Sequence, residues 1–330
     1  MKKLLLALAV GILAYSCSTE AIDNFTIRIK PNIMEHIAMI EITDANDPTT
    51  DIQNLTIAVD GAIASDVYEI SGSQDFQLID GRITIGIHPR RNPVAGQTIN
   101  VPVVITGDGY LTKRRVIEFT AEERTQLVEI PLVNVVSPPT GVSFSITPGI
   151  SLTGGALPAA QNIVIPPGQG STTGMEIDLD AGTSFIDRDG NSISGSNLEV
   201  VAGHFDSDNE ESLDAFPGGF SADSIQQDDG SYEAGAFQTA GFTTMDMTVD
   251  GQEVKSFSQP ITVTMDVSAN ALNPNTGQPI ALGDVIPIWS YDDEEGTWVY
   301  ETDGTTIQGP NGLQVSYQTT HLSWWNIDYF

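Results

Sequence analysis

The chain has 330 residues, of which 44 are Asp or Glu and 13 are Lys or Arg, so its formal net charge at pH 7 is −31. Such an acidic surface repels the phosphates of nucleic acids and anionic lipid head groups, and we expect neither as a partner. A single cysteine excludes an intrachain disulfide, so the folded part must be stabilised by apolar burial. The length allows two ordinary hydrophobic cores, and a hydrophobic content of 40% is typical of folded domains.

The N-terminal segment, residues 1–16, has the pattern of a secretion signal. Met1-Lys2-Lys3 is basic, and Leu4–Tyr15 is apolar apart from Gly11. A run of about a dozen apolar residues is shorter than the ~20 that a helix needs to cross a bilayer. The pattern therefore favours a signal peptide that is removed before the protein folds.

Ser16-Cys17 ends this segment and resembles the cleavage site of bacterial lipoproteins, in which the cysteine becomes the first residue and its thiol carries a diacylglycerol. The resemblance implies a signal peptide over 1–16, lipidation of Cys17, a tether over 17–21 and an outer-membrane lipoprotein exposed at the cell surface. Its alkyl chains would bind the membrane stably, since each buried methylene contributes about 0.8 kcal/mol. Ala14-x-Ser16 also suits ordinary signal peptidase, which would release a soluble secreted protein.

Apolar and polar residues alternate along most of the remaining chain, as they do around Ile83, Ile85 and Ile87. A period of two predicts strands with one apolar face. Asp-Gly pairs separate these runs and are favoured at hairpin turns, because glycine accepts a positive φ. The seven pairs begin at residues 60, 80, 108, 189, 229, 250 and 303. We therefore expect an all-β fold of antiparallel β-sandwich domains.

The best domain boundary is the segment 136–141, which contains Pro138-Pro139. Two adjacent prolines do not fit a central strand. The charge also changes here, because only Arg188 and Lys255 are basic after Arg124, whereas 27 acidic residues lie beyond residue 140. We expect a β-sandwich over 22–137, a linker over 138–141 and an acidic β-rich domain over 142–330, which a further boundary near 250 would divide in two.

The first domain resembles immunoglobulin-like sandwiches of the prealbumin or carboxypeptidase-regulatory type. The segments that carry this resemblance are 44–48, 55–61, 80–85, 107–111 and 126–133. It implies an accessory module without catalytic residues.

The second domain resembles extracellular β-rich regions of bacterial surface proteins, such as those of Bacteroidota, and of animal cartilage intermediate layer proteins. The segments that carry this resemblance include 162–168, 182–190, 216–220, 287–291, 296–298 and 320–328. It implies a non-catalytic surface role in adhesion, assembly or ligand binding, with a surface protein or a glycan as partner. The alternative is a polysaccharide-binding accessory lipoprotein of an uptake system.

His321-Leu322-Ser323 is similar to the cleavage sequence of autoproteolytic domains of the GAIN type. In that chemistry Ser323 would attack the Leu322 carbonyl with His321 as general base, and water would open the resulting ester. The alternative is an ordinary closing strand. Apart from this motif we expect no enzyme, because the four histidines lack zinc-ligand spacing and the chain has no Gly-x-Ser-x-Gly motif or phosphate-binding loop.

Calcium is the only cofactor that the sequence suggests. Asp206, Asp208 and Glu210 concentrate the hard oxygen donors that calcium prefers, and they are the candidate ligands. The segment Asp187–Asn191 has a similar composition, but a hairpin turn explains it better. For Asp206–Glu211 and for 292–295 the alternative is a solvated acidic loop.

Aromatic residues near the C-terminal end suggest a surface on which sugars would stack, with Trp298, Trp324 and Trp325 as candidates. Adjacent tryptophans on a strand point to opposite faces, so one of Trp324 and Trp325 would be exposed if the other were buried. The alternative is that these rings fill the core of a sandwich.

Overall fold

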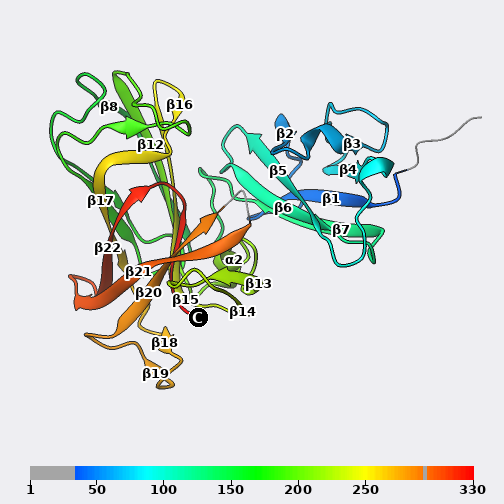
Figure 1. Cartoon of the computed structure of the whole chain (residues 1–330). Coiled ribbons are helices and arrows are strands. Elements are labelled where there is room, and N and C mark those ends of the chain that lie inside the picture. Colours follow the sequence, from blue (N-terminus) through cyan, green and yellow to red (C-terminus); the bar gives the residue numbers. More distant parts are fainter. Residues whose placement is uncertain (1–33, 293–295) are drawn as a thin grey trace, which may run out of the picture. The chain divides into compact units, whose positions relative to one another are not determined.

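Strands follow one another along almost the whole of the chain that the computed structural model describes, residues 34–292 and 296–330 (Figure 1). Helical structure in these ranges is limited to α2 (Glu210–Leu213) and the 3-10 helices η2 (Ala64–Asp66) and η3 (Pro89–Arg91). None of the helices in the described part is long and apolar enough to cross a bilayer. The prediction of an all-β fold is confirmed. The signal peptide, Cys17 and the tether lie outside the described residues.

Seven strands between residues 37 and 132 form two sheets, with the strand orders β3-β4-β1-β7 and β2-β5-β6. Their bounds are β1 (Ile37–Asp44), β2 (Leu55–Val59), β3 (Val67–Glu69), β4 (Arg82–Ile87), β5 (Ile99–Gly107), β6 (Lys113–Phe119) and β7 (Thr125–Leu132). β1 is antiparallel to β4 but parallel to β7. This parallel pair departs from the purely antiparallel sandwich that we expected.

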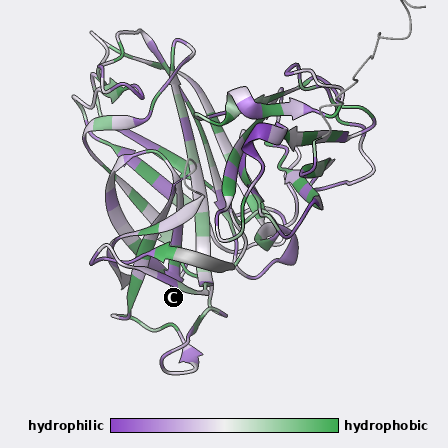
Figure 2. Ribbon diagram, turned by 45° about the vertical axis from the view of Figure 1, so that its right-hand side comes forward, coloured by the Kyte–Doolittle hydropathy of each residue, from purple (hydrophilic) through white to green (hydrophobic). Residues whose placement is uncertain are grey.

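The core of this N-terminal sandwich lies between its two sheets. The alternating residues Ile83, Ile85 and Ile87 of β4 are buried there, together with Ile57 and Val103 of the facing sheet. Each side chain of this kind contributes roughly 1.5–3 kcal/mol when it is fully buried. Figure 2 shows hydrophobic and hydrophilic residues succeeding one another along the strands.

Strands between residues 142 and 329 pair into one extended sheet in the order β8-β12-β15-β23-β20-β21-β22-β17-β10-β9. Four further strands branch from it, and β18 and β19 form a separate pair. Their bounds are β8 (Val142–Ser151), β9 (Gln161–Ile165), β10 (Met175–Leu179), β11 (Phe185–Ile186), β12 (Asn197–Phe205), β13 (Ser221–Gln226), β14 (Tyr232–Ala236), β15 (Gln238–Val249), β16 (Gln252–Glu253), β17 (Ser256–Asp266), β18 (Leu272–Asn273), β19 (Gln278–Pro279), β20 (Val285–Asp292), β21 (Thr297–Gln308), β22 (Leu313–His321) and β23 (Trp324–Tyr329). Pro138 and Pro139 lie between the last strand of the first group and the first strand of the second.

Distant parts of the extended sheet share one core, which defines the C-terminal sandwich. Met245 of β15, Val263 of β17, Tyr317 of β22 and Trp325 of β23 all belong to this core. The rings of Tyr317 and Trp325 lie 5.2 Å apart, centroid to centroid. Strands from both sides of residue 250 therefore fold around the same apolar interior.

β23 lies between β15 and β20, and all six of its side chains are buried. Trp325, Ile327 and Tyr329 point into the core just described. Trp324 lies in a second aromatic core, on the other face of the sheet. Because side chains alternate along a strand, Asn326 and Asp328 lie on the Trp324 face. β23 is thus a central strand with two buried faces.

Six of the seven Asp-Gly pairs have their glycine at positive φ, as expected for turns. At Asp80-Gly81 and Asp250-Gly251 both residues have positive φ, the geometry of a type I′ hairpin turn. The prediction was wrong for Asp303-Gly304, which lies inside β21. There a side chain on Gly304 would collide with Val315 of β22, so close approach of the strands explains this glycine.

Candidate functional site

The motif His321-Leu322-Ser323 joins β22 to β23. The Ser323 hydroxyl donates to the Tyr291 carbonyl at 2.8 Å and accepts from the Tyr291 amide at 3.1 Å. The His321 imidazole instead has its Nε2 3.6 Å from Glu301 Oε1, and its ring packs against Trp325. Self-cleavage requires the His321 imidazole to activate the Ser323 hydroxyl. In the structure these two groups interact with different partners.

A hollow of about 520 Å³ lies beside this motif. Its lining includes His321, Ser323, Glu301, and the only two basic residues after Arg124, Arg188 and Lys255. Charge is balanced locally, because Lys255 Nζ lies 2.6 Å from Glu253 Oε1. Arg188 lies 3.8 Å from Asp60 of the N-terminal sandwich, so both basic side chains are joined into ion pairs within the protein.

The candidate calcium ligands are occupied by hydrogen bonds within the protein. Asp206 is buried, and it accepts from the Ser171 hydroxyl and, at 2.8 Å, from the Asp208 amide. Asp208 accepts from Ser268 at 2.5 Å and from Asn270 at 2.9 Å.

Glu210 is exposed at the start of α2. Across residues 34–292 and 296–330, no three His, Cys, Asp or Glu side chains come together as a metal site. Asp187 accepts from the amides of Asp189 and Asn191, as in the hairpin turn that we preferred for this segment. Residues 293–295 of the other acidic loop lie outside the described residues.

The three candidate tryptophans are all buried, with Trp298 and Trp325 each 1% exposed and Trp324 7% exposed. Trp298 stacks on Phe216, and its indole N–H donates to the Pro217 carbonyl at 3.1 Å. Sugar stacking requires an exposed ring face, and these rings fill cores on both sides of the sheet instead. The expectation of a stacking surface at these residues is therefore not met.

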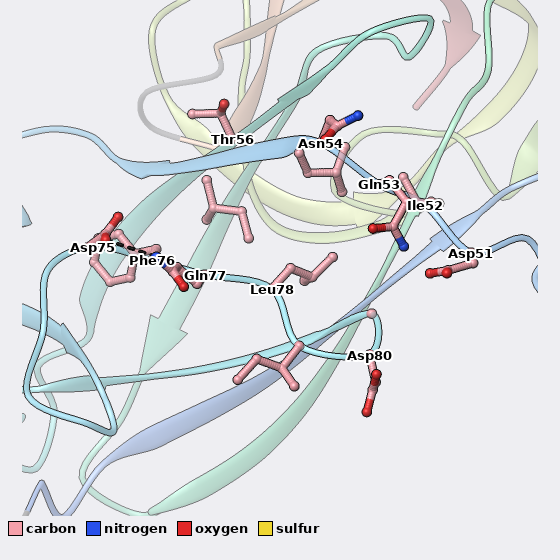
Figure 3. A pocket seen from close by; sticks show the side chains of 14 residues that line it. Asp51, Ile52, Gln53, Asn54, Thr56, Asp75, Phe76, Gln77, Leu78 and Asp80 are labelled. Atoms are coloured by element: carbon pink, nitrogen blue, oxygen red, sulfur yellow. Dashed lines mark hydrogen bonds between the residues drawn. The ribbon is translucent and has the colours of Figure 1, made fainter.

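A groove in the N-terminal sandwich was not expected from the sequence. It has a volume of about 610 Å³ and lies between β2 with its preceding residues and the segment that leads into β4 (Figure 3). We call it the β2 groove and define it by its lining residues, 51–57 and 75–81. Ile52, Leu55, Ile57, Phe76 and Leu78 contribute apolar side chains that also pack on the sandwich core.

The β2 groove is acidic. Asp51, Asp75 and Asp80 line it, and its 14 lining residues include no Lys, Arg or His. Asp75 accepts from the Gln77 side chain at 3.0 Å. Asp51 and Asp80 are exposed, and within the described chain neither carboxylate has a hydrogen-bond or ion-pair partner. The groove thus combines an apolar floor with uncompensated negative charge.

Two turns about twenty-five residues apart in sequence build this groove, and this separation hides it from sequence reasoning. Within these turns Asn54 and Asp80 adopt positive φ angles, of 59° and 49° respectively. The signal that was present is the pair of stretches 51–54 and 74–77, in each of which three of four residues are polar. That signal indicates turns, but it does not show that the turns face each other.

Two buried titratable groups lie in the C-terminal sandwich. His204 of β12 is 1% exposed, and burial lowers its pKa to about 4, against the smaller opposing effects of Asp206 and Asp266. Burial raises the pKa of Asp328 well above its ordinary value. The Asp328 carboxylate accepts from the Asn326 side chain at 2.8 Å and from the Gln238 amide at 2.7 Å. Neither side chain is exposed to solvent.

Comparison with known proteins adds no family to this description: no protein-family model matches the chain, and no curated protein matches its sequence.

Proposed function

We propose that the chain is a lipid-anchored protein of the bacterial cell envelope that acts by binding a partner molecule in the β2 groove. The observation that carries this proposal is the groove itself, a concave surface whose apolar side chains pack on the sandwich core and whose exposed lining is mostly polar. Ligand-binding sites in proteins are concave and contain polar groups that orient the ligand. Adhesion, assembly and ligand capture all require a site of this kind and no catalytic group.

The groove stands on the β-sheets of the N-terminal sandwich, so its walls are held in place. Ile57 of β2 is buried in the sandwich core, and Ile52 is nearly as well covered. Side chains fixed by packing lose little conformational entropy when a ligand binds. The rim residues Asp51, Gln53 and Gln77 remain exposed and can contact a ligand directly.

Cys17 would place this groove at the membrane surface. The lipoprotein signal supports anchoring through a diacylglycerol on its thiol, with residues 17–33 between the lipid and the described part of the chain. Anchoring on a lipid keeps a binding protein at the cell surface without a spanning segment. Ordinary signal peptidase cleavage after Ser16 would instead release the same binding protein.

The anchor is tested by detergent phase partitioning of the protein expressed with its own signal in a bacterial host. We expect the wild type in the detergent phase, with a mass increase that corresponds to an acylated glycerol, and Cys17→Ser in the aqueous phase. Recovery of an unmodified wild type in the aqueous phase would overturn the anchor and leave the secreted alternative.

The binding role is tested by retention of envelope components on immobilised protein. The variant Asp51→Asn/Asp75→Asn/Asp80→Asn removes the charge of the groove with isosteric side chains, and asparagine tolerates the positive φ of residue 80. Glu122→Gln/Glu123→Gln is the matched control, because both residues are exposed in the same sandwich and lie outside the groove. We expect only the groove variant to lose the retained material. Equal retention by all three proteins would refute binding in the groove.

A further inference from the structure

We propose that the β2 groove binds an extended, cationic polypeptide segment, which pairs with the open edge of β2 as an added strand. This inference rests on the proposed binding function and specifies its ligand class. It is carried by three features of the described residues: an unpaired strand edge, apolar side chains on every second residue of β2, and three carboxylates in a lining that contains no basic residue.

The edge of β2 that faces the groove is unpaired. Among the described residues β2 pairs only with β5, in antiparallel register. The Asp60 amide donates to the carbonyl of Pro102 directly opposite, at 2.9 Å. Hydrogen-bonded and non-hydrogen-bonded positions alternate along such a pair, so Leu55, Ile57 and Val59 direct their N–H and C=O groups away from β5. These groups form the row that an added strand requires.

The other long edges of the N-terminal sandwich carry residues that discourage strand addition, whereas β2 does not. β6 presents Lys113, Arg114 and Arg115 in succession, and β7 contains Glu129 and Pro131. Charged side chains and proline are the usual means of protecting an edge. β2 has the sequence Leu-Thr-Ile-Ala-Val, with no charge and no proline. An edge left open in this way is available for a specific partner.

The groove also provides places for the side chains of such a strand. Side chains of an extended peptide alternate, so every second one would point toward the floor formed by Leu55, Phe76 and Leu78. Figure 3 shows Leu78 between β2 and Asp80, with Asp75 at one end of the groove and Asp51 and Asp80 at the other. The remaining side chains would point outward, within reach of these acidic ends.

The negative charge of the groove favours a cationic peptide over a neutral glycan as its ligand. Three carboxylates in a lining without basic residues favour lysine or arginine in the bound segment, because opposite charges speed encounter and exclude acidic competitors. The hydroxyl groups of a neutral glycan could donate to these carboxylates, but they would not compensate the negative charge or match the alternating donors and acceptors of the β2 edge. A cationic peptide in extended conformation satisfies both features at once.

The experiment measures fluorescence polarisation of a labelled peptide with alternating valine and lysine, about eight residues long, against the mature chain carrying Cys17→Ser. We expect saturable binding that weakens with salt. The triple asparagine variant of the groove should bind on the order of tenfold more weakly, and Glu122→Gln/Glu123→Gln should bind like the wild type. Wild-type affinity in the groove variant would overturn the proposal.

Two further peptides test strand addition itself. N-methylation of one alternate set of amides removes the donors that face β2, and methylation of the other set removes only outward donors. We expect one methylated peptide to lose binding and the other to retain it. Equal binding of both, or of a scrambled peptide with prolines, would reduce the interaction to charge alone and overturn the strand model.

Comparing the binding of neutral oligosaccharides with that of the cationic peptide tests the ligand class separately from the proposed binding function. If neutral oligosaccharides bind the wild type but not the groove variant, and the cationic peptide does not bind, the ligand class is wrong and the binding function stands. If neither probe binds and envelope components are retained equally by every variant, both proposals fail.

Discussion

The imidazole Nε2 of His204 lies 2.9 Å from the hydroxyl oxygen of Thr173, and no described residue hydrogen-bonds the other ring nitrogen, Nδ1. Burial holds this histidine neutral, with a pKa of about 4 compared with 6.5 for an unperturbed side chain. Because the unfolded chain takes up the proton first, protonation favours unfolding throughout the interval between these two values.

We therefore expect the contribution of His204 to the free energy of unfolding to fall by roughly 3 kcal/mol as the pH drops from about 6.5 to about 4, and to be constant above that interval. Asp328 acts in the opposite direction over this range, so the contribution of His204 is read from the difference between wild type and variant. His204→Gln keeps a polar partner for Thr173 without a titrating group and should lack this component. Urea unfolding at a series of pH values measures it. The carboxylates of Asp250 and Asp284, whose pKa values backbone hydrogen bonds lower, act only at more acidic pH. An identical slope in wild type and His204→Gln would contradict the prediction.

Asp328 should have the opposite effect on stability. Burial raises its pKa, so the folded state retains a proton that the unfolded state has lost, and stability falls as the pH rises above about 4 toward the folded value. Asp328→Asn removes this loss and should unfold at higher temperature than the wild type at pH 7, with a smaller difference in acid. Thermal unfolding measures the difference, and Glu199→Gln, an exposed position on β12, is the control. Lower stability of Asp328→Asn at every pH would contradict this account.

The tryptophans should behave as core residues. Trp298→Ala or Trp325→Ala should reduce the free energy of unfolding by about 3–5 kcal/mol, because each leaves a large cavity. Phenylalanine at either position should cost less. Urea unfolding gives these values, and iodide should quench the fluorescence of the native wild type only weakly. Strong iodide quenching, or a change of emission on addition of polysaccharides, would show that a ring is accessible.

Ser323 should stabilise the junction of β22 and β23 rather than cleave it. Its hydroxyl makes two hydrogen bonds to the Tyr291 backbone, and Ser323→Ala should therefore cost about 1–3 kcal/mol of stability. We expect the purified mature protein to have the mass of one uncleaved chain, and we expect the His321→Ala variant to be uncleaved as well. Two fragments that meet at Leu322-Ser323 in the wild type and not in Ser323→Ala would restore the cleavage hypothesis.

Calcium should not stabilise the region around Asp206. Hydrogen bonds from Ser171 and Ser268 already occupy carboxylate oxygens of Asp206 and Asp208. A cation would have to displace these donors and gather ligands that point in different directions. We expect the same midpoint of thermal unfolding in chelator and in millimolar calcium. A calcium-dependent rise that Asp206→Asn abolishes would identify a site that the hydrogen bonds conceal.

Local patterns were enough to predict the strands and most of the turns. The alternation of Ile83, Ile85 and Ile87 follows directly from the two-residue period of a strand, and Asp80-Gly81 is a turn because glycine accepts positive φ. These features depend only on residues that are neighbours in sequence.

The remaining features depend on which strands meet. The parallel pairing of Ile37 with Thr125 joins residues far apart in sequence, and no local pattern specifies it. Gly304 has the sequence of a turn, but its place in β21 is decided by contact with Val315. For the same reason the burial of both Trp324 and Trp325, and the groove between residues 51–57 and 75–81, could not be predicted from composition or periodicity.

The position of β23 sets an order for biosynthesis. β23 comes after every other strand of the extended sheet in the chain, yet it lies in the middle of that sheet, between β15 and β20. A nascent chain that has not yet released Trp324–Tyr329 leaves two neighbouring strand edges and both aromatic cores open. The C-terminal sandwich is therefore completed only when its last strand has been released, and it needs protection from aggregation until that strand arrives.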